Sequence, residues 1–218
     1  MQPTVSVLTA TWNRASFLEG ALRSVLAQSF SAWEHLVIDD GSTDETPALL
    51  SRLVHPRLRV FRTGNGGQAE ALNLGIREAK GEWLGFLDSD DEFLPHHLST
   101  LLGEAGDQDL LLARFELVNC TRDPEPHVRD FYRPGFEIAV QDIEVITGAL
   151  FVRTDLARDL GGFRHVPSTD TDFYQRARER GARCRRIREP TYRYFFGRDA
   201  DNSMALRDLA SDKKTGEH

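Results

Sequence analysis

The chain has 218 residues, a net charge of −7 and 40% hydrophobic residues, which suits a packed core in one large domain or two small ones. The acidic balance argues against nucleic acid as the main partner. Arginines cluster between Arg176 and Arg188, a pattern more typical of a solvated helix face than of a phosphate site.

No apolar stretch approaches the roughly 20 residues that cross a bilayer, and the N-terminus lacks the basic-then-apolar pattern of a signal peptide. The two cysteines, Cys120 and Cys184, match no metal-binding or redox spacing. We therefore expect two buried thiols in a protein of the reducing cytoplasm.

Short apolar strands alternate with amphipathic helices over the first hundred residues. The expected strands are residues 5–11, 35–38, 58–62 and 83–87, and the expected helices are residues 17–26, 46–53 and 68–79. Ser16 is the expected N-cap of the first helix, with Glu19 three residues later completing a capping box. Strand–helix alternation with short turns predicts right-handed crossovers and a doubly wound, mostly parallel α/β sheet.

This alternation of strands and helices does not continue in the second half of the chain, which we expect to be smaller, with a mixed arrangement of strands. Apolar runs predict strands at residues 110–118, 136–140, 146–152, 184–187 and 192–196, and helices at residues 98–102, 153–160 and 169–180. Without an internal repeat or a linker, residues 1–198 are expected to form one domain in two halves that meet near residue 100. Residues 199–218 are expected to form a polar, mobile tail.

The strand at residues 83–87 ends abruptly in Asp88-Ser89-Asp90-Asp91. Ligands of open α/β sheets bind outside the carboxyl ends of the strands, so these carboxylates emerge where chemistry is expected. Closely packed carboxylates repel one another unless a cation lies between them, and hard oxygen ligands suit Mg²⁺ or Mn²⁺. The plainer alternative is a solvated acidic turn that caps the following helix.

Two neighbouring strands also end in suggestive side chains, Thr11-Trp12-Asn13-Arg14 and Asp39-Asp40. Parallel strands place these two ends and the acidic end at Asp88 along one edge of the sheet, which we call the rim. An aromatic ring, a carboxylate and an acidic cluster on one rim suit a nucleotide diphosphate: Trp12 to flank the base, Asp40 to accept a base N–H, and a metal to bridge the phosphates. Alternatively, Trp12 is a packed aromatic and Asp39 caps the helix after Gly41.

Four segments then carry a resemblance: VSVLTATWNR, VIDDGSTDETP, GNGGQAEALNLGIREAKGEWLGFLDSDD and GGF…STDTDFYQRARERG. In order and spacing they resemble family 2 glycosyltransferases of the GT-A fold, over roughly residues 4 to 190. The resemblance implies that a sugar moves with inversion from a nucleotide diphosphate donor, usually a UDP-sugar, to a hydroxyl of a glycan, lipid-linked or other acceptor. It also implies Mn²⁺ or Mg²⁺, a nucleotide-binding half at residues 1–100 and an acceptor half at residues 101–198, and it leaves room for peripheral contact with a membrane.

The resemblance also implies roles for single residues. Asp40 falls on the acid that binds the base, Asp88 on the acid near the ribose, Asp90 on the metal ligand and Asp170 on the catalytic base. We expect further donor contacts from Thr11, Trp12, Arg14, Gly67, Gln68, Ser89 and Arg193. A carboxylate opposite the leaving group removes the proton of the attacking hydroxyl, although Asp170 could instead be a helix N-cap.

Two departures from the family pattern bear on catalysis and on metal affinity. Thr169 precedes Asp170 where members often have glutamate. Phe195 occupies the region where many have a histidine that ligates the metal, so either Asp199 or Asp201 substitutes or the metal keeps more water. We also expect the tail from Arg198, which includes Arg207, to close over the donor as a lid, although it could be only a solvated terminus.

Three other functions compete with transfer. A phosphoaspartate hydrolase also has Asp-x-Asp after a strand. That class of enzyme has threonine or valine at the position that Glu92 occupies in this chain. A nicotinamide dehydrogenase would need G-x-G-x-x-G in the first strand-to-helix turn, which the chain lacks. The stronger rival is a non-catalytic nucleotide-sugar-binding relative, because one acid beside Asp170 is missing.

Overall fold

Eight strands form one sheet in the computed structural model, which describes residues 2–129, 137–143 and 145–198. The strands are β1 (Val5–Thr11), β2 (Trp33–Asp39), β3 (Leu58–Arg62), β4 (Trp83–Phe86), β5 (Glu92–Phe93), β6 (Leu110–Asn119), β9 (Leu150–Arg153) and β10 (Cys184–Phe196). A separate hairpin-like pair consists of β7 (His127–Arg129) and β8 (Glu137–Ala139). The helices are α1 (Ala15–Leu26), α2 (Thr46–Ser51), α3 (Gln68–Glu78), α4 (His97–Ala105), α5 (Thr154–Asp159) and α6 (Thr169–Glu179), with 3₁₀ turns η1 (Val140–Asp142) and η2 (Thr147–Ala149).

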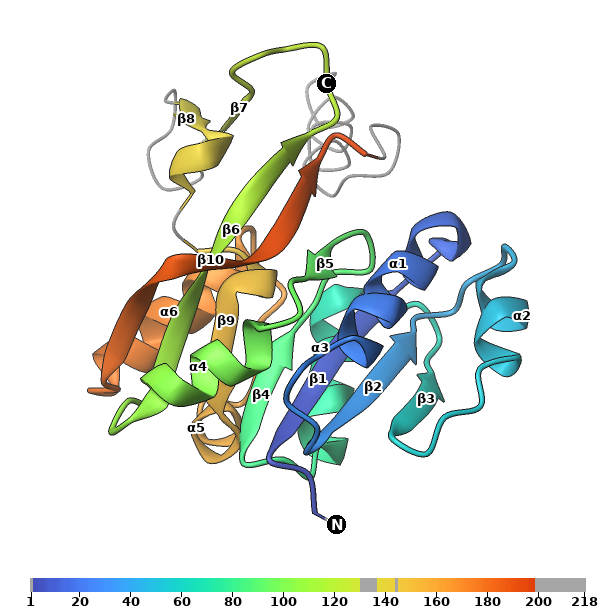
Figure 1. Cartoon of the computed structure of the whole chain (residues 1–218), viewed down its shortest axis with the longest axis horizontal. Coiled ribbons are helices and arrows are strands. Elements are labelled where there is room, and N and C mark those ends of the chain that lie inside the picture. Colours follow the sequence, from blue (N-terminus) through green and yellow to red (C-terminus); the bar gives the residue numbers. More distant parts are fainter. Residues whose placement is uncertain (1, 130–136, 144, 199–218) are drawn as a thin grey trace, which may run out of the picture.

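The sheet order is β3-β2-β1-β4-β9-β6-β10-β5 (Figure 1). The first four strands are parallel, and β6 and β10 are parallel to each other. The strand β9 runs antiparallel to both β4 and β6, and β5 runs antiparallel to β10. This confirms the expected α/β fold with a mostly parallel sheet and a mixed second half.

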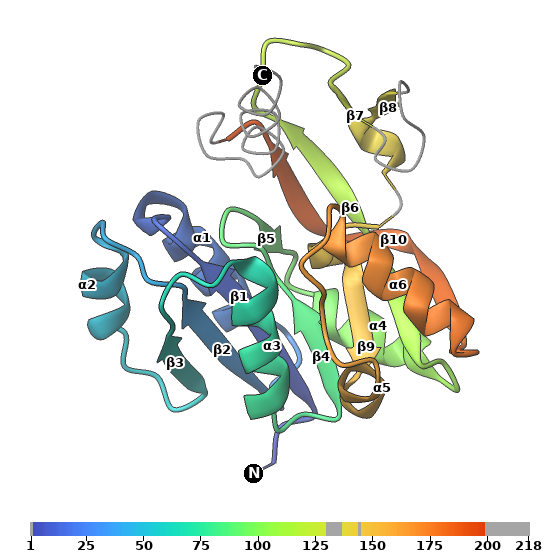
Figure 2. The ribbon, with the colours of Figure 1, turned by 180° about the vertical axis from the view of Figure 1, so that it is seen from behind.

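Helices cover both faces of the sheet, as Figures 1 and 2 show from opposite sides. Alternate residues of one strand serve the two faces: Val5 and Val7 belong to the core cluster that includes residues of α1 and α4, whereas Leu8 belongs to the cluster that includes residues of α3 and α6. Because both faces are covered, β1, β2 and β4 are almost entirely buried. The polar side chains buried inside β1 and β2 pair across the two strands, Ser6 with Glu34 and Thr9 with His35.

The predicted N-cap at Ser16 is wrong, because α1 begins one residue earlier and Ser16 lies in its first turn. The first amides are satisfied from another part of the chain. Arg14 N–H donates to Thr46 Oγ1 at 3.1 Å, and Ala15 N–H donates to Asp44 Oδ2 at 3.2 Å. A carboxylate beside a helix N-terminus also interacts favourably with the helix dipole, so Asp44 in the loop before α2 and Thr46 at the start of α2 replace a local cap.

The expected capping box is also absent, because Glu19 instead forms an ion pair with Arg23 one turn further along α1. The two strands predicted at 184–187 and 192–196 are one strand, β10. Its register with β6 shifts on both sides of Pro190, which has no N–H to give to a ladder and is accommodated as a local irregularity. The apolar run 146–152 divides into η2 and β9.

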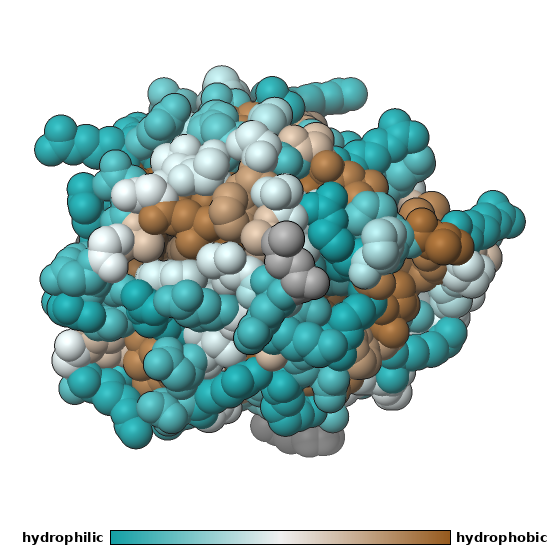
Figure 3. All heavy atoms as spheres, turned by 60° about the horizontal axis from the view of Figure 1, so that its bottom comes forward, coloured by the Kyte–Doolittle hydropathy of each residue, from teal (hydrophilic) through white to brown (hydrophobic). Residues whose placement is uncertain are grey.

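The expectation of buried thiols is wrong for Cys120, which is exposed just beyond the end of β6, and only partly right for Cys184, which is half-buried. In the described part of the chain, no helix combines the length and apolar character needed to cross a membrane. Hydrophilic side chains predominate on the face in Figure 3, where they interrupt the apolar areas.

Candidate active site

Asp88 lies at the end of β4 with polar groups from two other elements around it. Its Oδ1 accepts a hydrogen bond from Gln68 Nε2 at 3.0 Å, so the first residue of α3 reaches the acidic loop. Burial and the negative charges of Asp90 and Asp170 raise the pKa of Asp88 to about 7, against the opposing effects of the Gly148 N–H and Arg14. The structure therefore brings Asp88, Asp90 and Asp170 into one electrostatic neighbourhood.

Asp90 faces the first helix. Its Oδ2 lies 4.0 Å from Arg14 Nη1, a pair that is partly shielded from solvent. The Asp90 carbonyl oxygen accepts a hydrogen bond from Arg198 Nη1 at 3.0 Å. Two arginines distant in sequence thus hold the side chain and the backbone of this residue.

Asp91 ties the acidic loop to β10. It is buried, and its Oδ1 accepts a hydrogen bond from Phe195 N–H at 2.9 Å. Among the described residues its Oδ2 has no hydrogen-bond partner. Burial, together with the charges of Asp88 and Asp90, raises the pKa of Asp91 well above its ordinary value. Asp91 therefore fixes the loop, while Asp88 and Asp90 line the site.

Asp170 lies in the first turn of α6. Its Oδ1 accepts a hydrogen bond from Thr171 N–H at 2.7 Å, and the helix has no side-chain cap at Ser168. Burial raises the pKa of Asp170, although the N–H groups of Thr171 and Thr147 act in the opposite direction. Asp170 thus satisfies one amide of the helix, and its charge also reaches Asp88.

Asp172, two residues further along α6, has a different environment. Its Oδ2 lies 2.7 Å from Arg176 Nε and its Oδ1 lies 3.7 Å from Arg164 Nη1. Arg176 in turn donates to the carbonyl oxygens of Leu160 and Gly162, both at 2.8 Å. Asp172 therefore stabilises the turn before α6.

Asp40 organises the glycine loop before α3. Its carboxylate accepts hydrogen bonds from Thr63 Oγ1 at 2.6 Å, Gly66 N–H at 2.9 Å and Gly67 N–H at 2.7 Å. Gly67 has a φ of 92°, a backbone conformation that favours glycine. Asp40 thus has a structural role that the sequence does not reveal, and its contact with a base remains a prediction.

The end of β1 is joined to the end of β2. Thr11 O accepts a hydrogen bond from Asp40 N–H at 2.8 Å, and the buried Thr11 Oγ1 has no partner among the described residues. Trp12 follows it and is half-buried. Asn13, to which the sequence analysis gives no role of its own, has a φ of 52°, and its Oδ1 accepts a hydrogen bond from Thr43 N–H at 2.8 Å. Asparagine tolerates this left-handed conformation.

Arg193 is not brought to the acidic loop. Its guanidinium lies 3.7 Å from Glu92 and 3.6 Å from Glu116, on an exposed part of β10. Arg198 takes its place, with the bond to Asp90 O and a guanidinium 4.2 Å from the centre of the Phe195 ring. Ser89 is buried within the loop. The predicted ligands Asp199 and Asp201, and Arg207, lie outside the described residues.

The described residues contain no group of three or more histidine, cysteine or acidic side chains arranged to hold a metal. Mg²⁺ and similar ions often bind one or two carboxylates together with substrate phosphates. The carboxylates of Asp88 and Asp90 are close enough to raise the pKa of Asp88 and are only partly balanced by Arg14. This donor set fits a cation that arrives with a diphosphate.

Residues 6–156 match the model of glycosyl transferase family 2. The succinoglycan biosynthesis protein ExoO of Rhizobium meliloti is 38% identical over 104 residues, which is 47% of this chain and 30% of that protein. The uncharacterized glycosyltransferase RT0329 of Rickettsia typhi is 29% identical over 147 residues, which is 66% of this chain and 45% of that protein. The chain thus spans less than half the length of these curated relatives.

Solved structures share the fold. S. aureus TarS 1-349 in complex with UDP-GlcNAc has a TM-score of 0.72 and 21% identity, covering 96% of this chain and 66% of that one. The mannosyltransferase PcManGT from Pyrobaculum calidifontis, in complex with GDP-Man and Mn²⁺, has a TM-score of 0.70 and 24% identity, covering 91% of this chain and 59% of that one. With the family match over residues 6–156, these findings establish that the chain belongs to glycosyl transferase family 2 and has a GT-A-type fold.

Proposed function

We propose that this protein transfers a sugar, with inversion, from a nucleotide diphosphate donor to a hydroxyl of a glycan or lipid-linked acceptor. The observation that carries the proposal is the proximity of Asp170 to the acidic loop: its charge raises the pKa of Asp88, which follows β4. On this proposal, the base for the acceptor would lie beside the site for the donor diphosphate.

The rim formed by β1, β2 and β4 is the proposed donor site. Asp40 and Trp12 would contact the base, and Asp88, held by Gln68, would lie near the ribose. Arg14 and Arg198 bring positive charge to the acidic loop, where they would offset part of the diphosphate charge. Thr11, Gly67 and Ser89 complete the rim. A UDP-sugar is the proposed donor, since TarS was solved with UDP-GlcNAc, although PcManGT was solved with GDP-Man.

Asp90 is the proposed ligand of Mn²⁺ or Mg²⁺, with Asp88 beside it. When bound, such an ion neutralises charge on the departing diphosphate. The complex of PcManGT with Mn²⁺ supports this assignment for a protein of the same fold. Arg14 and Arg198, which lie beside the acidic loop, would neutralise part of the same diphosphate charge.

Asp170 is the proposed general base. The acceptor hydroxyl forms the new bond to the anomeric carbon as the bond to the diphosphate breaks, and Asp170 takes the hydroxyl proton. A single displacement on the face opposite the leaving group inverts the anomeric centre. Burial, which raises the pKa of Asp170, also makes the carboxylate a stronger base.

A non-catalytic nucleotide-sugar-binding protein is the second candidate. It is favoured by Thr169, whose Oγ1 donates to Arg164 O at 2.6 Å and so serves the turn before α6. No second carboxylate therefore adjoins Asp170 at that position. Such a protein would bind the donor without moving its sugar.

The proposed function is tested by incubating the protein with UDP- and GDP-sugars and Mn²⁺, with simple glycan or lipid-linked acceptors. We expect release of the nucleoside diphosphate, UDP or GDP, from at least one donor, and a product whose anomeric configuration in the NMR spectrum is opposite to that of the donor. Donor binding without release of the nucleoside diphosphate would favour the non-catalytic candidate. The free thiols fit a reducing compartment, and the reducing cytoplasm is the proposed location.

Arg198 and Arg193 provide a paired prediction about donor binding. Arg198→Met should weaken UDP binding in Mn²⁺ by about tenfold, because one charge-assisted hydrogen bond contributes on the order of 1.5 kcal/mol or more. Arg193→Met removes the same charge from an exposed pair and should change UDP affinity less than about threefold. Isothermal titration calorimetry measures both, and a larger loss in Arg193→Met would contradict the placement of Arg198.

A further inference from the structure

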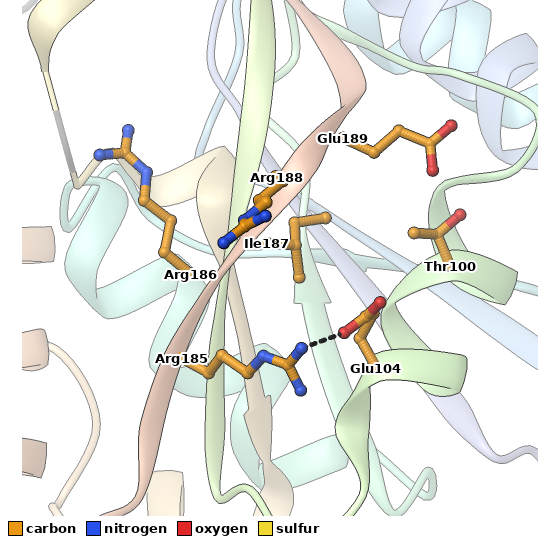
Figure 4. A pocket seen from close by; sticks show the side chains of 7 residues that line it. All are labelled: Thr100, Glu104, Arg185, Arg186, Ile187, Arg188 and Glu189. Atoms are coloured by element: carbon orange, nitrogen blue, oxygen red, sulfur yellow. Dashed lines mark ion pairs between the residues drawn. The ribbon is translucent and has the colours of Figure 1, made fainter.

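A groove of about 490 Å³ lies away from the proposed active site, between β10 and α4 (Figure 4). Residues 185–189 of β10 form one side, and Thr100 and Glu104 of α4 form the other. Asp170 is carried by α6, which packs on the opposite face of the sheet from α4. The groove is therefore a separate feature of the molecule.

The side of the groove formed by β10 is an edge of the sheet. The strand β6 pairs with one side of β10, and β5 pairs with the other side only at Tyr192 and Arg193. Within the described residues, no strand lies beside the preceding part of β10. An edge strand presents backbone N–H and C=O groups on which another strand can be added.

The side chains of the groove combine an apolar base with positive charge. Ile187, only 5% exposed, points toward α4 in Figure 4. Arg185 is held at the rim by Glu104, at 2.7 Å. Arg188 is exposed, and the described residues include no hydrogen-bond or ion-pair partner for it. Glu189 adds one negative charge, 3.6 Å from the imidazole of His96.

We infer that this groove binds an extended acidic peptide segment of another protein, which adds as a strand to the free edge of β10. Main-chain hydrogen bonds to the edge give affinity in this binding mode, and side-chain pockets give specificity. Arg188 selects an acidic residue of the added strand, whereas Arg185, already paired with Glu104, and the buried Ile187 shape the wall of the groove.

A second copy of β10 fits the groove poorly. The edge sequence Arg185-Arg186-Ile187-Arg188 carries three positive charges, and pairing with itself would bring like charges together across the strands. Charged residues on an edge strand often only prevent self-association. The groove against α4 goes beyond that protective role, since it leaves room beside the edge for a partner strand.

The test uses a fluorescent heptapeptide of alternating glutamate and valine, with blocked ends, and the full-length protein. Fluorescence anisotropy should show saturable binding. N-methylation of the alternate amides that face the edge should weaken binding about tenfold, as expected when a backbone hydrogen bond is lost. A lysine–valine peptide should not bind. Equal affinity of the methylated and parent peptides would overturn the inference, because charge alone would then account for binding.

A charge reversal at Arg188 provides the matched variant. Arg188→Glu should weaken binding of the glutamate–valine peptide and strengthen binding of the lysine–valine peptide. Arg52→Glu makes the same change at an exposed residue after α2 and should leave both affinities unchanged. Equal effects of the two variants would contradict the groove, and so would retention on phosphatidylglycerol vesicles without any peptide binding. Melting temperatures establish that each variant is folded.

Discussion

Replacing Asp170 with asparagine should almost abolish sugar transfer while leaving nucleotide binding nearly intact. A general base acts on the acceptor proton in the transition state, and its loss typically lowers the rate by about 10²- to 10⁴-fold. Asparagine keeps the side-chain size, and its carbonyl oxygen can still accept the hydrogen bond that Asp170 Oδ1 accepts from Thr171 N–H. Transfer kinetics and UDP titration on the same preparation measure the two effects.

Asp172→Asn is the control for this prediction, and its expected effect is different. Asp172 contacts Arg176, which holds the carbonyl oxygens of Leu160 and Gly162. The substitution should lower the melting temperature and largely preserve transfer. Loss of transfer in Asp172→Asn, with activity retained in Asp170→Asn, would show that the acidic pair is assigned in the wrong order.

The metal-free protein should gain more stability from Asp88→Asn at pH 8 than at pH 5, where the gain is less than about half as large. The folded-state pKa of Asp88 is raised from 3.8 to about 7, so the folded state holds this proton more tightly than the unfolded state. The contribution of protonated Asp88 to the free energy of unfolding is therefore most favourable below pH 4. It is lost progressively as the pH rises toward 7. Ionised Asp88 costs up to about 4 kcal/mol at pH 8, and asparagine removes that cost.

Other carboxyl groups complicate a simple comparison of the parent at two pH values. Burial also raises the pKa of Asp91 and Asp170, whereas hydrogen bonds lower the pKa of Asp44 and Asp109. The measurement is therefore the difference in melting temperature between Asp88→Asn and the parent, in EDTA, at pH 5 and pH 8. The same difference at both pH values would contradict the raised pKa of Asp88.

The sequence predicts those parts of the site that depend on a single strand end. An apolar strand followed by Asp88-Ser89-Asp90 already points to the edge of a parallel sheet, and β4 has that position. Strand–helix alternation likewise predicts the order of elements in the first half. Both predictions depend on the pattern of apolar and polar residues within a short segment, which can be read directly from the sequence.

Contacts between distant segments could not be read from the sequence in the same way. The groups that cap α1, Asp44 and Thr46, lie about thirty residues after the helix starts. Asp40 bonds to the amides of Gly66 and Gly67 because the ends of β2 and β3 meet in the sheet. Such partners are set by topology.

Arg193 shows how ladder register sets the neighbours of a side chain. In the ladder it lies opposite Glu92 and Glu116, which take its charge. Arg198, five residues later and just past the end of the strand, reaches Asp90 instead. The sequence alone gives neither the register of β10 with β5 and β6 nor the contact of Arg198.

The most direct test of the metal-dependent donor site is the thermal stabilisation of the protein by UDP, compared in Mn²⁺ and in EDTA, for the parent and for Asp90→Asn. Ligand that binds only the folded state adds about 2.7 kcal/mol at one hundred times its Kd. We expect UDP to raise the melting temperature of the parent by several degrees more in Mn²⁺ than in EDTA, and this difference to vanish in Asp90→Asn. Full metal-dependent stabilisation of Asp90→Asn would contradict the assignment of Asp90 as the metal ligand.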